Sequence, residues 1–160
     1  MKRFFVITLL LVGCFTLLSA ERIDNYHVDI VVEQSGELSI TETIDYHFEN
    51  ISKHGIFRDI PYQIKAASVT KDIGLYQFSV QIDGGYVAWE QSTQHSKRAG
   101  ELIRLKIGSP STYVKGKHTY TISYKVKMGV VPAAQNEHQD AIRWNLIGTG
   151  WQIPIHNTQA

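Results

Sequence analysis

The stretch Thr119-Tyr120-Thr121-Ile122-Ser123-Tyr124-Lys125-Val126-Lys127-Met128 decides the fold class. Apolar or aromatic residues occupy every second position, and polar or charged residues occupy the positions between them. Successive side chains of a β-strand point to opposite faces, so this period of two predicts a strand with one buried and one exposed face. Such a strand belongs to a sheet that packs against a second layer.

Two segments near the start of the chain show the same alternation on either side of Gln34-Ser35-Gly36. A three-residue loop there places Val32 opposite Leu38, and Gly36 supplies the positive φ that such a hairpin commonly needs. The segments therefore predict a long hairpin, interrupted on its apolar face only by Glu42. The residues of that face are Tyr26, Val28, Ile30, Val32, Leu38, Ile40, Ile44, Tyr46 and Phe48.

A second hairpin is predicted at Gly84-Gly85. A two-residue Gly-Gly turn would pair Ile82 with Val87 and Val80 with Trp89.

The remaining chain also reads as short strands between turns. Residues 91–100 are polar and are interpreted as a flexible loop, Ile103 to Ile107 as a half-exposed strand, and Ile142 to Leu146 as a last strand, ended by Gly148-Thr149-Gly150. No segment after residue 20 has a convincing helical period. We therefore expect an all-β fold, an antiparallel β-sandwich of the immunoglobulin or fibronectin kind, as one domain over residues 21–160.

The first twenty residues have the layout of a secretory signal peptide. Lys2 and Arg3 precede an apolar stretch from Phe4 to Leu18, and small residues lead up to Ala20, after which we expect cleavage. An uncleaved anchor is the alternative, although the apolar run is shorter than the roughly 20 residues of a spanning helix. A second alternative is lipidation at Cys14, because Leu11-Val12-Gly13-Cys14 resembles a bacterial lipobox.

The composition of the remaining chain excludes several kinds of protein. Cys14 is the only cysteine, so residues 21–160 contain neither a disulfide nor a thiolate. Without Lys2 and Arg3 the chain has 14 Lys and Arg against 15 Asp and Glu, a net charge of −1. No basic stripe suggests a nucleic-acid partner.

Several stretches together resemble a known family, and the run from His54 to Pro61 is the most specific of them. In this order the set is similar to the N-terminal domain of the predicted bacterial membrane proteins called domain of unknown function 2207, over nearly all of residues 23–155. The stretches are Gly36 to Ile44; His54-Gly55-Ile56-Phe57-Arg58-Asp59-Ile60-Pro61; Ile107-Gly108; Gly116 with Tyr120, Ile122 and Tyr124; and Trp144-Asn145 with Gly148, Gly150, Trp151, Pro154 and Ile155.

This resemblance implies an extracytoplasmic module of a membrane protein and implies no reaction. In the family, more extracytoplasmic chain and then transmembrane helices follow, whereas this sequence stops at Ala160. We therefore expect either a fragment of a longer protein or a freely released version, with membrane attachment only through a C-terminal region absent here. A sandwich of this extent is expected to lack an edge strand, which leaves an unpaired sheet edge.

His54, Arg58 and Asp59 are the candidate ligand- or partner-binding residues. In the functional interpretation they lie on an exposed loop, where Arg58 grips an anionic group and His54 responds to pH. In the structural interpretation Ile56, Phe57 and Ile60 close the end of the sandwich, and the charged residues satisfy groups of a loop across it. The structural interpretation is preferred, and a buried Arg58 would cost about 3–5 kcal/mol to remove.

Other candidate chemistry has a simpler explanation. Glu42 and Asp45 are a conceivable hydrolytic pair, but Glu42 is expected to lie at a sheet margin or to pair with a Lys or Arg. Trp89, Trp144 and Trp151 are expected in the core rather than on a stacking platform. The histidines are scattered, and we expect no metal and no cofactor.

The sequence thus predicts a non-catalytic binding or structural module of a bacterial envelope protein on the periplasmic or extracellular face of the membrane. Its expected partner is an envelope protein or a cell-wall component. The alternatives are a hydrolase of envelope polymers and an independent secreted ligand-binding protein. Convergence of Glu42, His54 and Asp59 in one pocket would favour the hydrolase.

Overall fold

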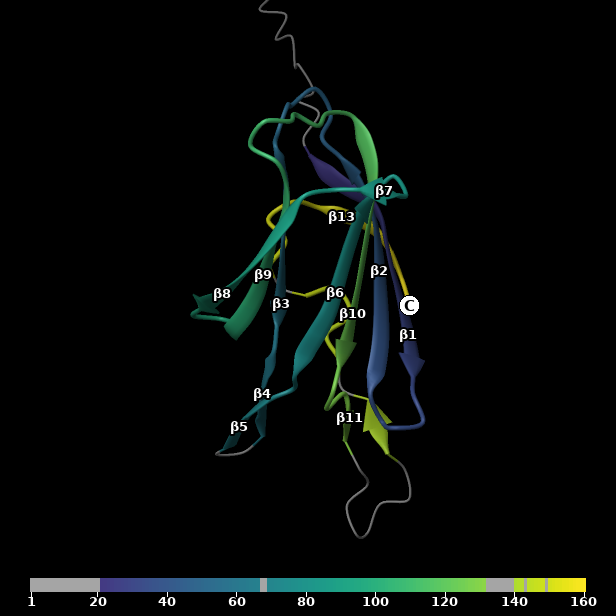
Figure 1. The fold of residues 1–160 in the computed structure, drawn as a ribbon, viewed down its shortest axis with the longest axis vertical. Helices are drawn as coiled ribbons and strands as arrows, with labels where there is room; N and C mark the ends of the chain where they lie inside the picture. Colours follow the sequence, from purple (N-terminus) through teal and green to yellow (C-terminus); the bar gives the residue numbers. More distant parts are fainter. Residues whose placement is uncertain (1–20, 67–68, 132–139, 143, 149) are drawn as a thin grey trace, which may run out of the picture.

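The computed structural model describes residues 21–66, 69–131, 140–142, 144–148 and 150–160, and these residues form strands and loops without a helix (Figure 1). The proposed signal peptide lies outside the described residues. The strands are β1 (Arg22–Val32), β2 (Leu38–His47), β3 (Gly55–Pro61), β4 (Gln63–Ala66), β5 (Val69–Asp72), β6 (Leu75–Ile82), β7 (Gly85–Tyr86), β8 (Trp89–Ser96), β9 (Gly100–Gly108), β10 (Lys117–Val126), β11 (Val130–Val131), β12 (Ala141–Ile142) and β13 (Ile155–Gln159).

The larger sheet has six strands in the order β13-β1-β2-β10-β6-β7. The segment that decided the fold class is β10, which pairs with β2 on one side and with β6 on the other. The long hairpin is confirmed with its register, because Val32 lies opposite Leu38 and Gly36 has a φ of +83°. The all-β, mainly antiparallel architecture is therefore as the alternation predicted.

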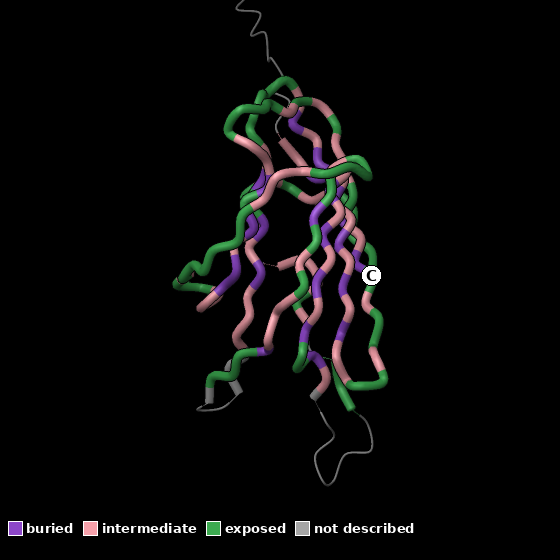
Figure 2. The backbone as a smooth tube through the Cα atoms, viewed as in Figure 1, coloured by how far each residue is buried: buried purple, intermediate pink, exposed green. Residues whose placement is uncertain are grey.

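The second layer is a three-stranded sheet in the order β3-β9-β8, whose inner face packs on the larger sheet (Figure 1). Buried residues follow the facing sides of the two sheets, and exposed residues concentrate at the turns and on β8 (Figure 2). Two short hairpins, β4–β5 and β11–β12, complete the described structure. The core thus lies between the layers, with side chains from alternate positions of both.

The turn predicted at Gly84-Gly85 is wrong by one residue. The structure turns at Asp83 and Gly84, which both have positive φ, and Ile82 pairs with Gly85. Asp-Gly is a preferred pair for such a two-residue turn. Trp89 does not pair with Val80; it begins β8 and pairs with Ile107 in the other sheet.

Two segments interpreted as loops are strands. Of the expected loop at residues 91–100, residues 91–96 belong to β8 and only residues 97–99 form a turn before β9; the polar side chains of β8 are mostly exposed because it is the outer strand of its sheet. The stretch expected to be a loop across the end of the sandwich is β3, which pairs with β9 from Gly55 to Pro61. Polar composition indicated exposure correctly in β8, but exposure does not exclude an edge strand.

The end of the chain also differs from expectation. The predicted last strand is reduced to the two residues of β12, and Trp144 and Leu146 follow it outside any strand. The sequence did not predict β13, which pairs with β1 in parallel, Ile23 lying opposite Ile155. This strand covers the edge of β1, so the larger sheet ends there on β13.

Candidate functional site

The alternation of β3 decides which of its residues face the core. Ile56 and Ile60 point inward and are buried, and Arg58 lies between them on the same face with 1% of its surface exposed. Phe57 points outward and is 56% exposed, so its expected role in closing the core is wrong. A strand that places an arginine on its inner face requires a buried partner for the charge.

That partner is Glu42, whose surface is fully buried. Glu42 lies in the middle of β2, opposite Val28 on one neighbouring strand and Ile122 on the other, and not at a sheet margin. Arg58 Nε donates to Glu42 Oε2 at 2.7 Å, and Nη2 donates to Oε1 at 2.7 Å. The predicted pairing of Glu42 with a cation is confirmed, and this bidentate pair joins the two sheets across the core.

Two tyrosines complete the hydrogen bonds of the pair. The hydroxyl of Tyr26 donates to Glu42 Oε2, and that of Tyr124 donates to Oε1, both at 2.7 Å. Arg58 Nη1 donates to the carbonyl oxygen of Asp59 at 2.7 Å. The carboxylate thus accepts four hydrogen bonds, which is the condition under which a buried ion pair is tolerated.

The surroundings of Arg58, Tyr26 and Tyr124 shift the pKa of each of these groups upward. Burial acts to lower the pKa of Arg58, but the charge and hydrogen bonds of Glu42 outweigh it and hold that pKa above its ordinary value. Burial, together with the negative Glu42, raises the pKa of Tyr26 and of Tyr124. The guanidinium therefore stays charged and the two phenols stay neutral donors over the physiological range.

Gly148 and Trp151, from the last stretch of the family resemblance, lie directly against this cluster. A Cβ on Gly148 would lie 2.6 Å from Arg58 Nη1, and the Arg58 guanidinium lies 5.8 Å from the centre of the Trp151 ring. Trp151 meets the ring of Tyr26 edge-on at 6.0 Å and donates from Nε1 to the carbonyl of Ile147. Trp151 is half-buried against the core, as are Trp89 and Trp144, which agrees with the preferred interpretation of the three tryptophans.

Asp59 lies on the opposite face of β3 and has a different partner. Arg104 of β9 donates from Nε and Nη2 to its two carboxylate oxygens at 2.7 Å each. The Arg104 guanidinium also lies 5.1 Å from the centre of the Phe57 ring. This pair is partly exposed, with 37% of the Arg104 side chain and 14% of the Asp59 side chain accessible.

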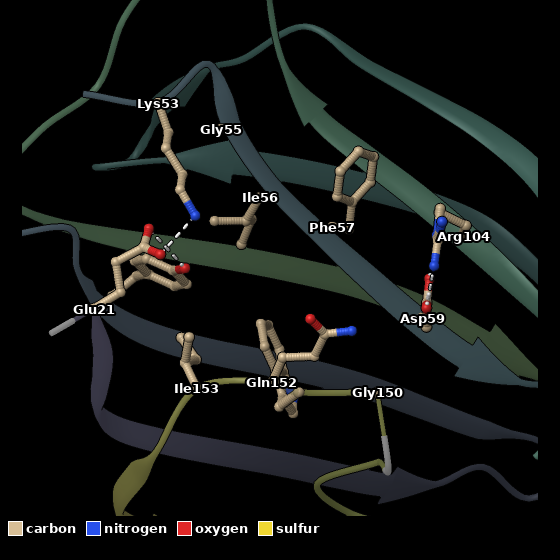
Figure 3. A pocket seen from close by; sticks show the side chains of 12 residues that line it. Glu21, Lys53, Gly55, Ile56, Phe57, Asp59, Arg104, Gly150, Gln152 and Ile153 are labelled. Atoms are coloured by element: carbon tan, nitrogen blue, oxygen red, sulfur yellow. Dashed lines mark hydrogen bonds and ion pairs between the residues drawn. The ribbon is translucent and has the colours of Figure 1, made fainter. Parts of the chain in front are cut away.

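A groove of about 580 Å³ runs beside this pair (Figure 3). One wall is β3 and the other is the segment 150–153, from which the Gln152 side chain points toward β3. Lys53 and Glu21 form an ion pair at the far end. The groove has a mixed lining of charged, aromatic and main-chain groups, so it is suited to a polar ligand.

His54 is separate from both arginines. Its Nδ1 lies 3.1 Å from the carbonyl oxygen of Thr112, and its ring lies 4.1 Å from that of Tyr113. Convergence of Glu42, His54 and Asp59 in one pocket would have favoured a hydrolase. Each of these groups instead has a different partner: Glu42 pairs with Arg58, His54 with the Thr112 carbonyl and Asp59 with Arg104. Of the three candidate binding residues, only Asp59 borders the groove beside Arg104, and Arg58 faces the core.

The sequence reasoning missed four participants. It did not connect Tyr26, Tyr124 or Trp151 with Arg58, and it did not consider Arg104 as the partner of Asp59. One signal was available, because a glutamate on the apolar face of a strand requires a buried cation or donors. Which cation it meets depends on how the two sheets are superposed, and alternation does not specify that.

Comparison of the chain with known protein families identifies the family to which it belongs. A model described as "Predicted membrane protein (DUF2207) N-terminal domain" matches residues 22–160. The chain belongs to this family. In the described residues no helix is long and apolar enough to cross a membrane.

No curated protein matches the chain. Among solved structures, native yeast leukotriene A4 hydrolase is similar at 16% identity with a TM-score of 0.45, covering 66% of this chain and 14% of that chain. The yeast enzyme in complex with bestatin is similar at 15% identity with a TM-score of 0.41 and the same coverage. The chain thus spans a small part of the hydrolase, and a similarity of this size says nothing about its activity.

Proposed function

We propose that the chain is a non-catalytic extracytoplasmic module of a membrane protein, with a binding role outside the cytoplasm. The observation that carries the proposal is that residues from the most specific family segments form a structural cluster in the core. Gly148 and Trp151 lie against Arg58, whose buried ion pair with Glu42 has its hydrogen bonds satisfied internally. Residues of this kind stabilise a scaffold, and the outer face of β3 with its groove is left for a partner.

The extracytoplasmic placement rests on the sequence. The positive residues Lys2 and Arg3, the apolar stretch to Leu18 and the small residues before Ala20 are typical of export. A fold of residues 21–160 without cysteine has no dependence on the redox state of its compartment. The family description as a predicted membrane protein agrees with a module that is displayed at a membrane.

Export is tested by fusing alkaline phosphatase, which is active only after export, to the C-terminus of the whole chain in a bacterial host. The matched control is Leu9→Arg/Leu10→Arg, which interrupts the apolar stretch without touching residues 21–160. We expect an active fusion and at least a tenfold loss in the control. An inactive fusion whose protein accumulates intact in the cytosol would refute the placement.

The non-catalytic part has its own test. The purified chain is incubated with bacterial cell-wall polymer, and the release of soluble fragments is followed. We expect the same release as with buffer alone. Hydrolysis by the wild type that is lost in Asp59→Asn, the variant of a groove carboxylate, would make the protein a hydrolase.

A further inference from the structure

One edge of β3 has no partner strand in the part of the chain that the structure describes. In the order β3-β9-β8 it pairs with β9 on one side only. The outer strands of the larger sheet, β13 and β7, do not pair with β3 either. An edge of this kind presents unpaired N–H and C=O groups, to which another extended chain can add.

The register shows which main-chain groups of β3 point to the open edge. Antiparallel partners alternate between hydrogen-bonded and non-hydrogen-bonded pairs. The N–H of Tyr62 donates to the carbonyl of Glu101 at 3.3 Å, which continues the β3–β9 register by one residue. Counting back from Tyr62 in steps of two, the main-chain N–H and C=O groups of Ile60 and Arg58 point to β9. Those of Asp59 and Phe57 therefore point to the open edge.

Pro61 fits this assignment. Proline has no N–H, and in sheets it is found where that N–H would face away from a partner strand. Pro61 is two residues beyond Asp59 and therefore belongs to the same edge-facing set. The open edge thus offers the main-chain groups of Phe57 and the N–H of Asp59, whose carbonyl already accepts from Arg58 Nη1.

The groove lies along this edge. Residues 55–57 and Asp59 form one wall, and residues 150–153 form the other (Figure 3). A second hollow of about 530 Å³ shares Asp59, Arg104 and residues 150–152 with it and reaches Pro61. From Lys53 to Pro61 an extended chain of eight steps spans about 27 Å.

The charges along the groove indicate the kind of peptide. At one end Lys53 is 46% exposed while its partner Glu21 is 10% exposed, and near the other end Arg104 is more exposed than Asp59. In both pairs the cation is the more accessible member, so the groove offers positive charge to a ligand. Arg98 adds a further exposed cation beside the second hollow.

We propose that this groove binds an extended peptide with acidic side chains, which adds as a strand to the open edge of β3. The peptide main chain pairs with Phe57 and Asp59, and its carboxylates lie near Lys53 and Arg104. The inference rests on the proposed binding role and gives it a ligand class. It does not depend on export, because binding is measured on purified protein.

The edge is tested first without a ligand, by amide hydrogen exchange on the purified 160-residue chain. The N–H groups of Arg58 and Ile60 are expected to exchange at least tenfold more slowly than those of Phe57 and Asp59. Equal protection of all four amides would show that the edge is already covered, and a dimer in light scattering would assign the cover to a second copy. Either result would overturn the proposal.

Binding is tested with a displayed library of random nonapeptides selected on the wild-type protein. We expect the selected peptides to be enriched in Asp and Glu, and their binding to fall at least tenfold in Phe57→Pro, which removes an edge N–H. Phe57→Thr is the matched control, since it removes the same ring but keeps that N–H, and circular dichroism checks that both variants fold. Selection of no peptide, selection of basic peptides, or equal losses in the two variants would overturn the proposal.

Discussion

Neighbouring residues of β3 form two ion pairs that are alike in geometry and opposite in environment. Arg58 with Glu42 and Arg104 with Asp59 are both bidentate, with donor–acceptor distances of 2.7 Å. The first pair is buried between the sheets, and the second lies at the rim of a groove. The same kind of ion pair therefore joins the two sheets when it lies on the inner face of β3 and borders a groove when it lies on the outer face.

The largest expected effect is that of Arg58→Ala. It leaves the buried Glu42 without its cation, so the free energy of unfolding is expected to fall by about 3–5 kcal/mol. Denaturant unfolding followed by circular dichroism measures this change. Phe57→Ala is the control on the same strand, with an expected loss of about 1 kcal/mol or less because that side chain is exposed. A loss below about 1 kcal/mol for Arg58→Ala would contradict the structural role of the buried pair.

The next effect concerns the contact of Gly148 with the buried pair. Gly148 and Gly36 have similar positive φ values, +77° and +83°, so an alanine is strained by about 1 kcal/mol at either position. Only at Gly148 does the new Cβ also meet Arg58, whereas nothing lies within 4 Å of it at Gly36. We expect Gly148→Ala to cost roughly 2–3 kcal/mol in denaturant unfolding. Equal losses in the two variants would show that the segment does not bear on Arg58.

A third effect appears at alkaline pH. Burial raises the pKa of Tyr26 and Tyr124 in the folded protein above the ordinary value of about 10. The stabilisation that these neutral phenols provide is fully present below the unfolded pKa and is lost as the pH rises above it. Each is expected to remove about 1.4 kcal/mol of stability per pH unit there.

The variant that isolates this term is Tyr124→Phe, which cannot ionise. Denaturant unfolding between pH 9 and pH 11.5 should show a shallower decline than in the wild type, whatever the stability at neutral pH. An identical decline in the two proteins would mean that Tyr124 does not titrate with unfolding.

The smallest effect is that of Arg104→Gln on the exposed pair. Partly exposed ion pairs contribute little, so a loss of about 0.2–1 kcal/mol is expected. Repeating the measurement in 1 M salt should remove most of the difference, because salt screens such pairs. A loss as large as that of Arg58→Ala would show that the two pairs do not differ as the structure indicates.

Much of the fold followed from alternation alone. The strand β10 and the hairpin of β1 and β2 have one apolar face each, and a one-residue slip would expose it, so the pattern fixes the register. The pattern failed for β8, where an edge strand carries polar residues on both faces, and for β13, whose exposed residues pair through the main chain. Main-chain pairing leaves no trace in side-chain composition.

The candidate site was predictable to a smaller degree. The sequence singled out Arg58, Asp59 and Glu42, and it favoured a structural role for the motif. It did not predict that Arg58 and Asp59 face opposite sides, because the segment was interpreted as a loop rather than as β3. Once the segment is known to be a strand, the alternation of Ile56, Arg58 and Ile60 places the arginine in the core.

The most direct measurement is a pair of double-mutant cycles, one on each ion pair, from denaturant unfolding. The first uses Arg58→Met, Glu42→Leu and their combination, and the second uses Arg104→Met, Asp59→Leu and their combination. The account predicts a coupling energy of roughly 2–3 kcal/mol for the buried pair, with the double variant more stable than either single one. It predicts less than about 1 kcal/mol for the exposed pair. Equal coupling in the two cycles would contradict the claim that the inner face of β3 holds the sheets together and the outer face does not.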